Sequence, residues 1–235
     1  MQNDFARGDV ISYVDMCRAV GASLQHGMNY RLNNSGSVFL MSRRVGAPYE
    51  DEIDDEGSTL IYEGHDHPRT AGINDPKRLD QPARLPSGKL TRNGLFLEAV
   101  RRHKELGDRP ELIRVFEKIK DGIWVYNGTF ELFDVWNQPS NGRIVFKFHL
   151  RLVLDDAFLS TQNPGLKDED DRIIPSWVKQ EVWKRDKGMC VLCGSVSFLH
   201  FDHVIPYSRG GSSKEPKNIR ILCRKHNLQK RDRIE

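Results

Sequence analysis

The sequence predicts an α+β fold in two parts: a mainly β domain over residues 1–155 and a small metal-binding domain over residues 175–235. Three observations predict this division. Apolar residues alternate with a period of two before residue 155, as in half-buried strands. Three of the four cysteines lie in the second part. The charge differs too, because residues 172–235 carry 14 Lys and Arg against 6 Asp and Glu, whereas residues 1–154 carry 21 of each kind.

The segment 156–174 is predicted to be an acidic linker. Residues 155–171 hold one basic and six acidic side chains, and Pro164 with Gly165 interrupts regular structure there. A long surface loop within one domain has the same composition, but the change of charge on either side favours a linker. The chain shows neither a secretion signal nor a run of about 18 apolar residues, so we expect a cytoplasmic protein.

The first part is predicted to be a strand-rich sheet. In "GRIVFKFHLRLVL" apolar residues occupy alternate positions from Ile144 to Leu154, which predicts a long half-buried strand. Shorter strands are predicted at 37–42, 58–63 and 129–136.

Two helices are predicted from spacing and end signals. In the segment 93–106, Phe96 and Val100 recur at helical spacing, so this helix is expected to pack on the sheet. The stretch "PSWVKQEVWKRDKG" opens the second part with Ser176 as a cap and Gly188 as the end of a helix.

Two pairs of residues predict a zinc site in the second part. Cys190 and Cys193 form a CxxC pair, and Cys223 with His226 forms a CxxH pair. A closed structural zinc site takes four N or S ligands in a tetrahedron, so His226 is needed as the fourth. Two alternatives are buried thiols without a metal, and a three-cysteine site that leaves His226 for catalysis but opens the zinc to solvent. Cys17 stands alone and is predicted to be a small buried hydrophobe.

Asp202 and His203 follow each other at the end of an apolar strand, before a loop rich in Pro and Gly. A carboxylate oxygen can hold a hard divalent ion while a neutral imidazole takes a proton from water, as metal-assisted hydrolysis requires. The net charge of +8 over residues 172–235 predicts a polyanionic partner, with nucleic acid as the first candidate.

These residues carry a resemblance to a known family. The stretch "RDKGMCVLCG…LHFDHVIPYSRGGSSKEPKNIRILCRKHNLQKRDR" is similar to the zinc-bearing HNH nucleases, which have a ββα-metal fold. The resemblance implies His203 as general base, Asp202 as a ligand of the catalytic Mg²⁺ or Mn²⁺, and Asn218 as the brace of the loop that holds His203. It makes Asn227, where the family commonly has His, the second ligand of that ion. His226 then stands where a zinc-binding Cys is common.

Two tyrosines flank an acidic run in the first part, because Tyr49 and Tyr62 lie on either side of residues 50–56. A solvated acidic turn between two strands is the simple explanation. Further blocks fall in the same order as in a known family, however, so residues 10–155 resemble the SRA domain, also called YDG. That domain has a PUA-like twisted sheet or barrel and flips a modified cytosine out of DNA. Its YDG triplet reads Tyr-Asn-Gly here, with Asn127 in place of the acid.

This second resemblance implies a pocket for a modified base. Tyr49 and Tyr62 would stack on the two faces of the flipped base. An acidic side chain would accept a hydrogen bond from the N4 amino group of cytosine. The family has Asp at the position of Glu52, so either Glu52 or the neighbouring Asp51 takes this role.

Two further groups of polar residues have competing interpretations. His65, Asp66 and His67 look like a metal trio, but successive side chains in an extended loop point apart, so loop or DNA contacts are favoured. Four basic residues flank the last predicted helix: Lys225, Lys230, Arg231 and Arg233. They are expected to contact phosphates, although an ordinary solvated face is the simpler possibility.

Together the resemblances imply a modification-dependent DNA endonuclease with a restriction role in a bacterial cytoplasm. Its partner would be double-stranded DNA that contains 5-methylcytosine or a related base, and its cofactors structural Zn²⁺ and catalytic Mg²⁺ or Mn²⁺. One HNH site cuts one strand, so double-strand cleavage implies a homodimer. Two alternatives stay open: a nuclease or nickase that does not depend on modification, and a non-catalytic reader of modified DNA.

Overall fold

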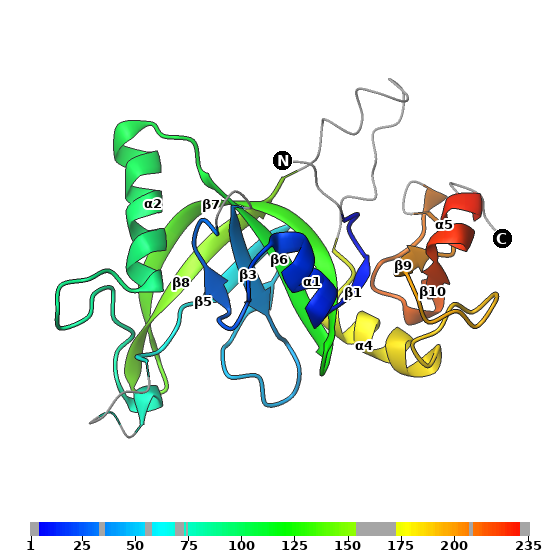
Figure 1. The fold of residues 1–235 in the computed structure, drawn as a ribbon, viewed down its shortest axis with the longest axis horizontal. Helices are drawn as coiled ribbons and strands as arrows, with labels where there is room; N and C mark the ends of the chain where they lie inside the picture. The colour runs from blue at the N-terminus through cyan, green and yellow to red at the C-terminus, as the bar shows by residue number, and fades with distance from the viewer. Residues whose placement is uncertain are drawn as a thin grey trace.

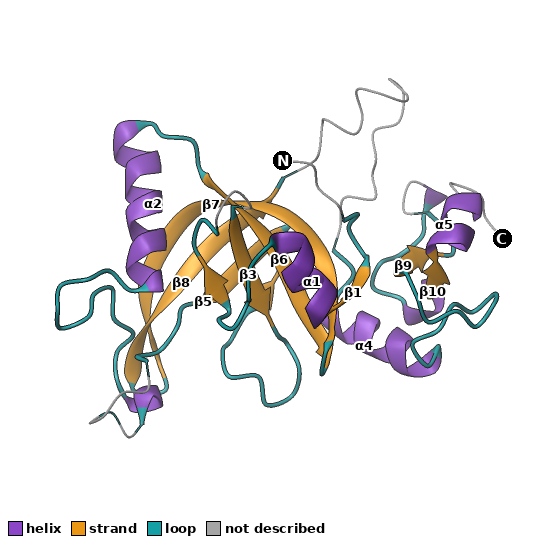
Figure 2. Cartoon of the chain, viewed as in Figure 1, coloured by secondary structure: helices purple, strands orange, loops and turns teal. Residues whose placement is uncertain are grey.

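The computed structural model describes residues 5–32, 36–54, 58–68, 73, 75–153, 173–206 and 209–230. A curved sheet forms the N-terminal part, and a small module with its own two-stranded sheet forms the C-terminal part (Figures 1 and 2). None of the helices in these ranges has the length and apolar content of a membrane-spanning segment. In chain order the elements are β1 Val10–Ser12, α1 Tyr13–Val20, β2 Met28–Asn29, β3 Ser37–Met41, β4 Glu52–Ile53, β5 Thr59–Glu63, η1 Pro76–Arg78, α2 Arg92–Leu106, β6 Glu111–Lys120, β7 Ile123–Ser140, β8 Arg143–Leu152, α4 Ser176–Arg185, β9 Leu199–His203, η3 Pro216–Asn218, β10 Ile219–Cys223 and α5 Arg224–Lys230.

The large sheet has the strand order β2-β3-β6-β7-β8-β5-β4, and β1 pairs with β7 outside this path. Only β3 and β6 run parallel among these pairs; the others are antiparallel. Register shifts between Val115 and Phe116 and between Leu132 and Asp134 mark bulges in the central strands. Bulges increase local twist, so they let the long strands β7 and β8 curve around the core.

Helix α2 lies where apolar spacing predicts a helix at residues 93–106, and both of its ends are capped. The Thr91 side chain accepts a hydrogen bond from Gly94 N at 3.2 Å, and Gly107 closes the helix in the left-handed conformation at φ 73°. Its buried residues Phe96 and Val100 join the core that fills the concave sheet. The sheet thus buries one face of α2 (Figure 1).

The predicted long strand is β8, and its burial pattern agrees with the predicted alternation except near the start of the strand. Ile144 is 37% exposed, whereas Val145 and Lys147 are fully buried. From Phe146 onward the apolar residues Phe146, Phe148, Leu150 and Leu152 are buried, whereas Arg151 is exposed as the alternation predicts. Lys147 is tolerated inside because its ammonium group has an ionic partner, described below. Leu154 lies outside the described residues.

The C-terminal module has the expected ββα order. Strands β9 and β10 pair antiparallel, α5 follows, and α4 packs beside β10. The predicted cap of α4 is wrong, because Pro175 occupies the N-cap position and no side chain caps the first turn. Most of the predicted linker lies outside the described residues. Its last two residues are buried, Ile173 in the core of the sheet and Ile174 in a cluster shared with the C-terminal module.

Candidate metal centre and nuclease site

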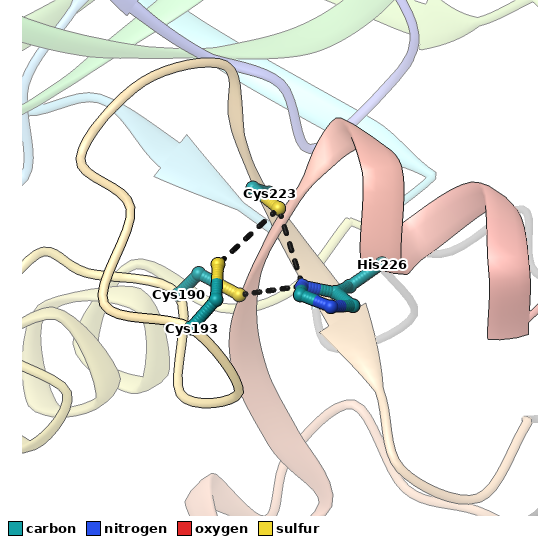
Figure 3. A group of neighbouring side chains, drawn as sticks. All are labelled: Cys190, Cys193, Cys223 and His226. Carbon is teal, nitrogen blue, oxygen red and sulfur yellow. Dashed lines mark hydrogen bonds between the residues drawn. The ribbon is translucent and has the colours of Figure 1, made fainter.

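Four side chains from two separate parts of the C-terminal module converge on one point (Figure 3). Cys190 and Cys193 lie in the loop after α4, Cys223 ends β10, and His226 lies on the first turn of α5. Their ligand atoms all lie within 4.8 Å of one another. His226 Nδ1 is 3.4 Å from Cys190 Sγ and 3.3 Å from Cys223 Sγ, and the Sγ atoms of Cys193 and Cys223 are 3.8 Å apart.

These separations fit a tetrahedral zinc ion. Zn–S bonds of about 2.3 Å and Zn–N bonds of about 2.0 Å give tetrahedron edges of roughly 3.5–3.8 Å. Burial raises the pKa of the Cys190 thiol, but backbone N–H groups of Cys223, Leu192 and Cys193 and the His226 ring outweigh this effect and bring the pKa to about 6. A thiolate is the form that binds zinc. The Cys₃His group therefore has the geometry and the chemistry of a structural zinc site.

His203 ends β9 at the opposite end of the β9–β10 ladder from Cys223, and its ring is oriented by Ser213. The distance from His203 Nε2 to Ser213 Oγ is 2.8 Å, and Ser213 is 6% exposed. The sequence contains Ser213 in the loop "GGSSK", which carries no signal that separates it from an ordinary turn serine. This contact with the imidazole was therefore missed by sequence reasoning.

Asn218 joins the two ends of the loop that follows His203. Its Oδ1 accepts a hydrogen bond from Ile205 N at 2.8 Å, and its Nδ2 donates to Ile205 O at 3.0 Å and to Ser212 O at 3.1 Å. Gly211 is needed at the closure, because a Cβ atom there would lie 1.8 Å from Ile205 O. The loop is thus tied across its base next to His203.

Asp202 faces two cationic side chains. Arg220, directly opposite in the β9–β10 ladder, places Nε 3.4 Å from Asp202 Oδ2, and Lys230 Nζ lies 2.7 Å from the same oxygen. Lys230 also contacts His203 O and is only 2% exposed. The prediction that Lys230 contacts phosphate is therefore wrong, because its ammonium group is buried against Asp202.

A divalent ion at Asp202 would be held by hard oxygen donors. Asn227 is half-buried on α5, three residues before Lys230, and so lies on the same side of the helix as the lysine that reaches Asp202. The Asp202 carboxylate and the Asn227 side-chain carbonyl are donors that Mg²⁺ and Mn²⁺ accept. Asp202 Oδ2 is shared with Lys230, so an ion would have to approach the carboxylate beside this ammonium group.

The two tyrosines of the predicted base pocket both lie next to the ring of His65. The Tyr49 ring stacks on His65 with centroids 4.9 Å apart and an interplanar angle of 10°, and the Tyr62 ring lies 6.2 Å from the same imidazole. Tyr62 is buried, with its Oη 3.2 Å from Leu40 O and from His65 Nε2. Asn93 fixes the His65 backbone through hydrogen bonds to both its N–H and its carbonyl.

His65 is therefore an aromatic partner of the tyrosines, consistent with a loop contact. Burial is the main cause that lowers its pKa to about 4, so the ring is neutral near pH 7. Asp66 instead pairs with Arg143 at 2.5 Å and with Lys77 at 3.1 Å, and His67 is half-buried. Among the residues that the structure places, only the Cys₃His group brings three or more metal-type side chains together, so His65–His67 form no such group.

The two acidic candidates of the base pocket differ in environment. Glu52 lies exposed on β4. Asp51 is buried and accepts hydrogen bonds from Glu63 N at 3.1 Å and from Ser42 N at 3.4 Å. Burial, with a smaller contribution from the Glu63 charge, raises the pKa of Asp51 to about 7.

Next to Asp51, Glu63 forms buried ion pairs with two basic residues of β8. Glu63 contacts Lys147 at 3.2 Å and Arg143 at 3.4 Å, and all three side chains are at most 5% exposed. Lys147 also donates to Glu50 O at 2.8 Å, which ties the acidic run to β8. This network was not foreseen, because its charged members come from segments 80 or more residues apart.

Comparison with known protein families gives a match in the C-terminal part of the chain. The family model described as HNH endonuclease matches residues 190–233. No curated protein sequence matches the chain.

Solved structures match the fold. The SUVH5 SRA domain in complex with hemimethylated CG DNA is 24% identical, covers 65% of this chain and 92% of its own, and has a TM-score of 0.44. The modification-dependent TagI restriction endonuclease is 18% identical, covers 97% of this chain and 78% of its own, and has a TM-score of 0.42. SUVH6 of Arabidopsis thaliana is 22% identical, covers 63% of this chain and 26% of its own, and has a TM-score of 0.41. The family model thus covers the C-terminal module, and the similarity to the solved structures extends over the N-terminal part at TM-scores below 0.5.

Proposed function

We propose that the protein is an endonuclease that recognises a modified cytosine in double-stranded DNA and hydrolyses nearby phosphodiester bonds. The proposal is supported by two features that occur together in one chain. His203 and Asp202 lie at a strand end within residues that match HNH endonucleases, and an aromatic site formed by Tyr49 and Tyr62 lies on the N-terminal sheet.

In the proposed reaction His203 is the general base that takes a proton from the attacking water. Ser213 holds the imidazole at its Nε2, and Asn218 keeps the following loop in place, so the base is oriented before the substrate arrives. Asp202 and Asn227 would hold Mg²⁺ or Mn²⁺, which when bound supplies positive charge to stabilise the pentacovalent phosphorus and the leaving 3′ oxygen.

For recognition, a cytosine flipped from the duplex would stack on Tyr49 in the place of the His65 ring. The His65 ring already stacks on that face of Tyr49, with the two ring centroids 4.9 Å apart, so the site suits a flat heterocycle. The His65 side chain would have to leave, while Asn93 keeps its backbone in position.

Glu52 is proposed as the acceptor for the N4 amino group of the base. Both oxygens of Asp51 already accept backbone N–H groups, whereas the Glu52 side chain is exposed on the same acidic run. Glu52→Gln should therefore reduce the preference for cytosine over thymine in a binding assay, and an unchanged preference would return this role to Asp51.

One experiment tests the function as a whole. Matched methylated and unmethylated plasmids are incubated with the protein and Mg²⁺ or Mn²⁺, and the products are separated by electrophoresis. Cleavage of the methylated plasmid alone is expected. Equal cleavage of both plasmids would support the nuclease without modification dependence, and binding without any cleavage would support the non-catalytic reader. Linear products rather than nicked circles would agree with a homodimer that carries two sites.

A further inference from the structure

Three polar side chains are buried between the N-terminal sheet and the C-terminal module. Lys179, on α4, places Nζ 2.5 Å from Glu117 Oε2 on β6 and 2.7 Å from Asn127 Oδ1 on β7. Asn127 Nδ2 in turn donates to Glu117 Oε2 at 3.1 Å. The three residues are 2%, 0% and 2% exposed, so water does not compete for these contacts.

The charges of this group balance only with an amide at position 127. Burial raises the pKa of Glu117, but the charge and hydrogen bond of Lys179 outweigh burial and keep its pKa below the ordinary value. One ammonium group therefore faces one carboxylate. The Asn127 amide donates a hydrogen bond to the Glu117 carboxylate and accepts one from the Lys179 ammonium group. An Asp at this position would add a second buried carboxylate next to Glu117, with repulsion and no partner for the added charge.

Apolar packing surrounds the polar contact. Ile119 and Val125, from β6 and β7, belong to the same buried cluster as Val178 and Val182 of α4. That cluster continues into the strands of the C-terminal module and reaches Cys190 and Cys223 of the metal centre. The sheet and the module thus share one hydrophobic core at this junction.

A second junction joins the backbone of the catalytic strand to the sheet. Phe201 N donates to Gly8 O at 3.1 Å, and the His200 Nδ1 lies 3.0 Å from Asp9 Oδ1. The next residues, Val10–Ser12, form β1, which pairs with β7. β9, whose end carries Asp202 and His203, therefore lies next to β1 at the edge of the sheet (Figure 1).

We infer that the nuclease module is held at a fixed place on the reader sheet by Lys179, Glu117 and Asn127, and that this junction sets the distance from the recognised base to the cut. The three residues are positioning residues, because none lies at the reacting atoms. The inference rests on the proposed function. It implies that the length of the segment 156–174, which joins the two parts in sequence, does not determine where the DNA is cut.

The first test lengthens that segment. Four Gly-Ser residues inserted after Asn163 add up to about 14 Å of chain, which is roughly the length of four nucleotides along one strand. Cut positions are mapped on a duplex with a single modified cytosine by denaturing electrophoresis. The positions should be unchanged to the nucleotide. Positions that move away from the modified base with the insertion would overturn the inference.

The second test breaks the junction. Lys179→Met removes the ammonium group and keeps the side-chain length, and Lys184→Met is the matched control on the exposed side of the same helix. Lys179→Met should spread the cut positions over several phosphodiesters while binding of modified DNA is retained. The double variant Lys179→Met with Glu117→Gln should restore a narrow distribution, since neither charge is then buried alone. If Lys179→Met cuts the DNA at the same narrow set of positions as the wild type, the inference is wrong.

Small-angle scattering without DNA separates this inference from the proposed function. The radius of gyration should be the same in the wild type and the Lys184→Met control, and larger in Lys179→Met. If the wild type cuts no modified DNA but shows this ordering, the docking stands and the proposed function fails. If the variant with the lengthened segment scatters as an extended two-body particle, the docking itself is disproved.

Discussion

The metal centre and the aromatic site differ in how far their side chains are separated along the chain. The zinc ligands come as two pairs with two residues between the partners of each, and each pair lies in one turn or one strand-to-helix junction. The aromatic site takes Tyr49, Tyr62 and His65 from a loop and a strand, Asn93 from α2, and its ionic support from β8. Local spacing encodes the first site, whereas only the packed sheet assembles the second.

A site can therefore be predicted from sequence when residues close together in the chain set its geometry. A two-residue gap places two ligands on one edge of a tetrahedron whatever the rest of the fold does. No comparable rule connects Glu63 with Lys147 and Arg143, which meet only because β5 pairs with β8.

The largest effect is expected from loss of a zinc ligand. Structural zinc contributes about 10–16 kcal/mol of apparent binding free energy in small zinc-dependent domains, so Cys223→Ala should lose the metal and unfold the C-terminal module. His226→Cys should keep the metal, because Cys is an equally good ligand. Metal analysis and circular dichroism measure both. A His226→Cys variant with full zinc and no cleavage would show that His226, and not Asn227, belongs to the reaction.

Loss of the general base should come next. His203→Ala is expected to lower the rate of cleavage by about 10²–10⁴-fold without changing the affinity for DNA. His103→Ala, on the far end of α2, is the control for removal of a partly exposed histidine. A single-turnover cleavage assay measures the rates, and a loss of less than tenfold would be inconsistent with a general base.

The buried Asp51 should make stability depend on pH. Its pKa of about 7 in the folded protein exceeds the ordinary value of 3.8, so the native state binds this proton more tightly than the unfolded chain. The free energy of unfolding should therefore fall as pH rises from about 4 to about 7, by up to roughly 4 kcal/mol, and stay level above that. Urea unfolding of Asp51→Asn should lack this contribution, whereas Asp108→Asn, an exposed control, should keep it. Equal pH profiles for wild type and Asp51→Asn would contradict a raised pKa.

Removal of the stacking platform should weaken binding to modified DNA. Base–aromatic stacking contributes about 1–3 kcal/mol, so Tyr49→Ala should reduce the affinity by roughly five- to 150-fold. Fluorescence anisotropy with a duplex that contains one modified cytosine measures the change, and the unmodified duplex is the control. An equal loss for both duplexes would place Tyr49 at the DNA backbone instead of the base.

The smallest effect is expected at His65. An aromatic pair contributes about 0.5–1.5 kcal/mol, and the base must displace this pair, so His65→Ala should raise the affinity for modified DNA by roughly two- to tenfold. Because the pKa of His65 is about 4, the gain should be constant between about pH 5 and pH 8. A weaker complex in the same anisotropy assay would show that His65 contacts the base and does not compete with it.

The fold was predictable where chain-local signals suffice. Helix α2 follows from its apolar spacing, and β3 and β5 lie within the predicted segments. Helix α1 was not foreseen, although Ser12 caps it and Gly21 ends it, because its eight residues offer too short a pattern. β8 was found, but its buried Lys147 could not be, since the strand that pairs with it is 80 residues away.

The sequence by itself determined the Cys₃His group, the place of Asp202 and His203 at a strand end, and the presence of a strand-rich first part. These features depend on spacings of two to four residues, which backbone geometry converts directly into positions. The tertiary structure alone decided that His65 stacks on Tyr49, that Lys230 is buried against Asp202, and that Lys179 joins the module to the sheet. The physical reason is that a buried side chain takes its partner from whatever strand or helix the fold places next to it.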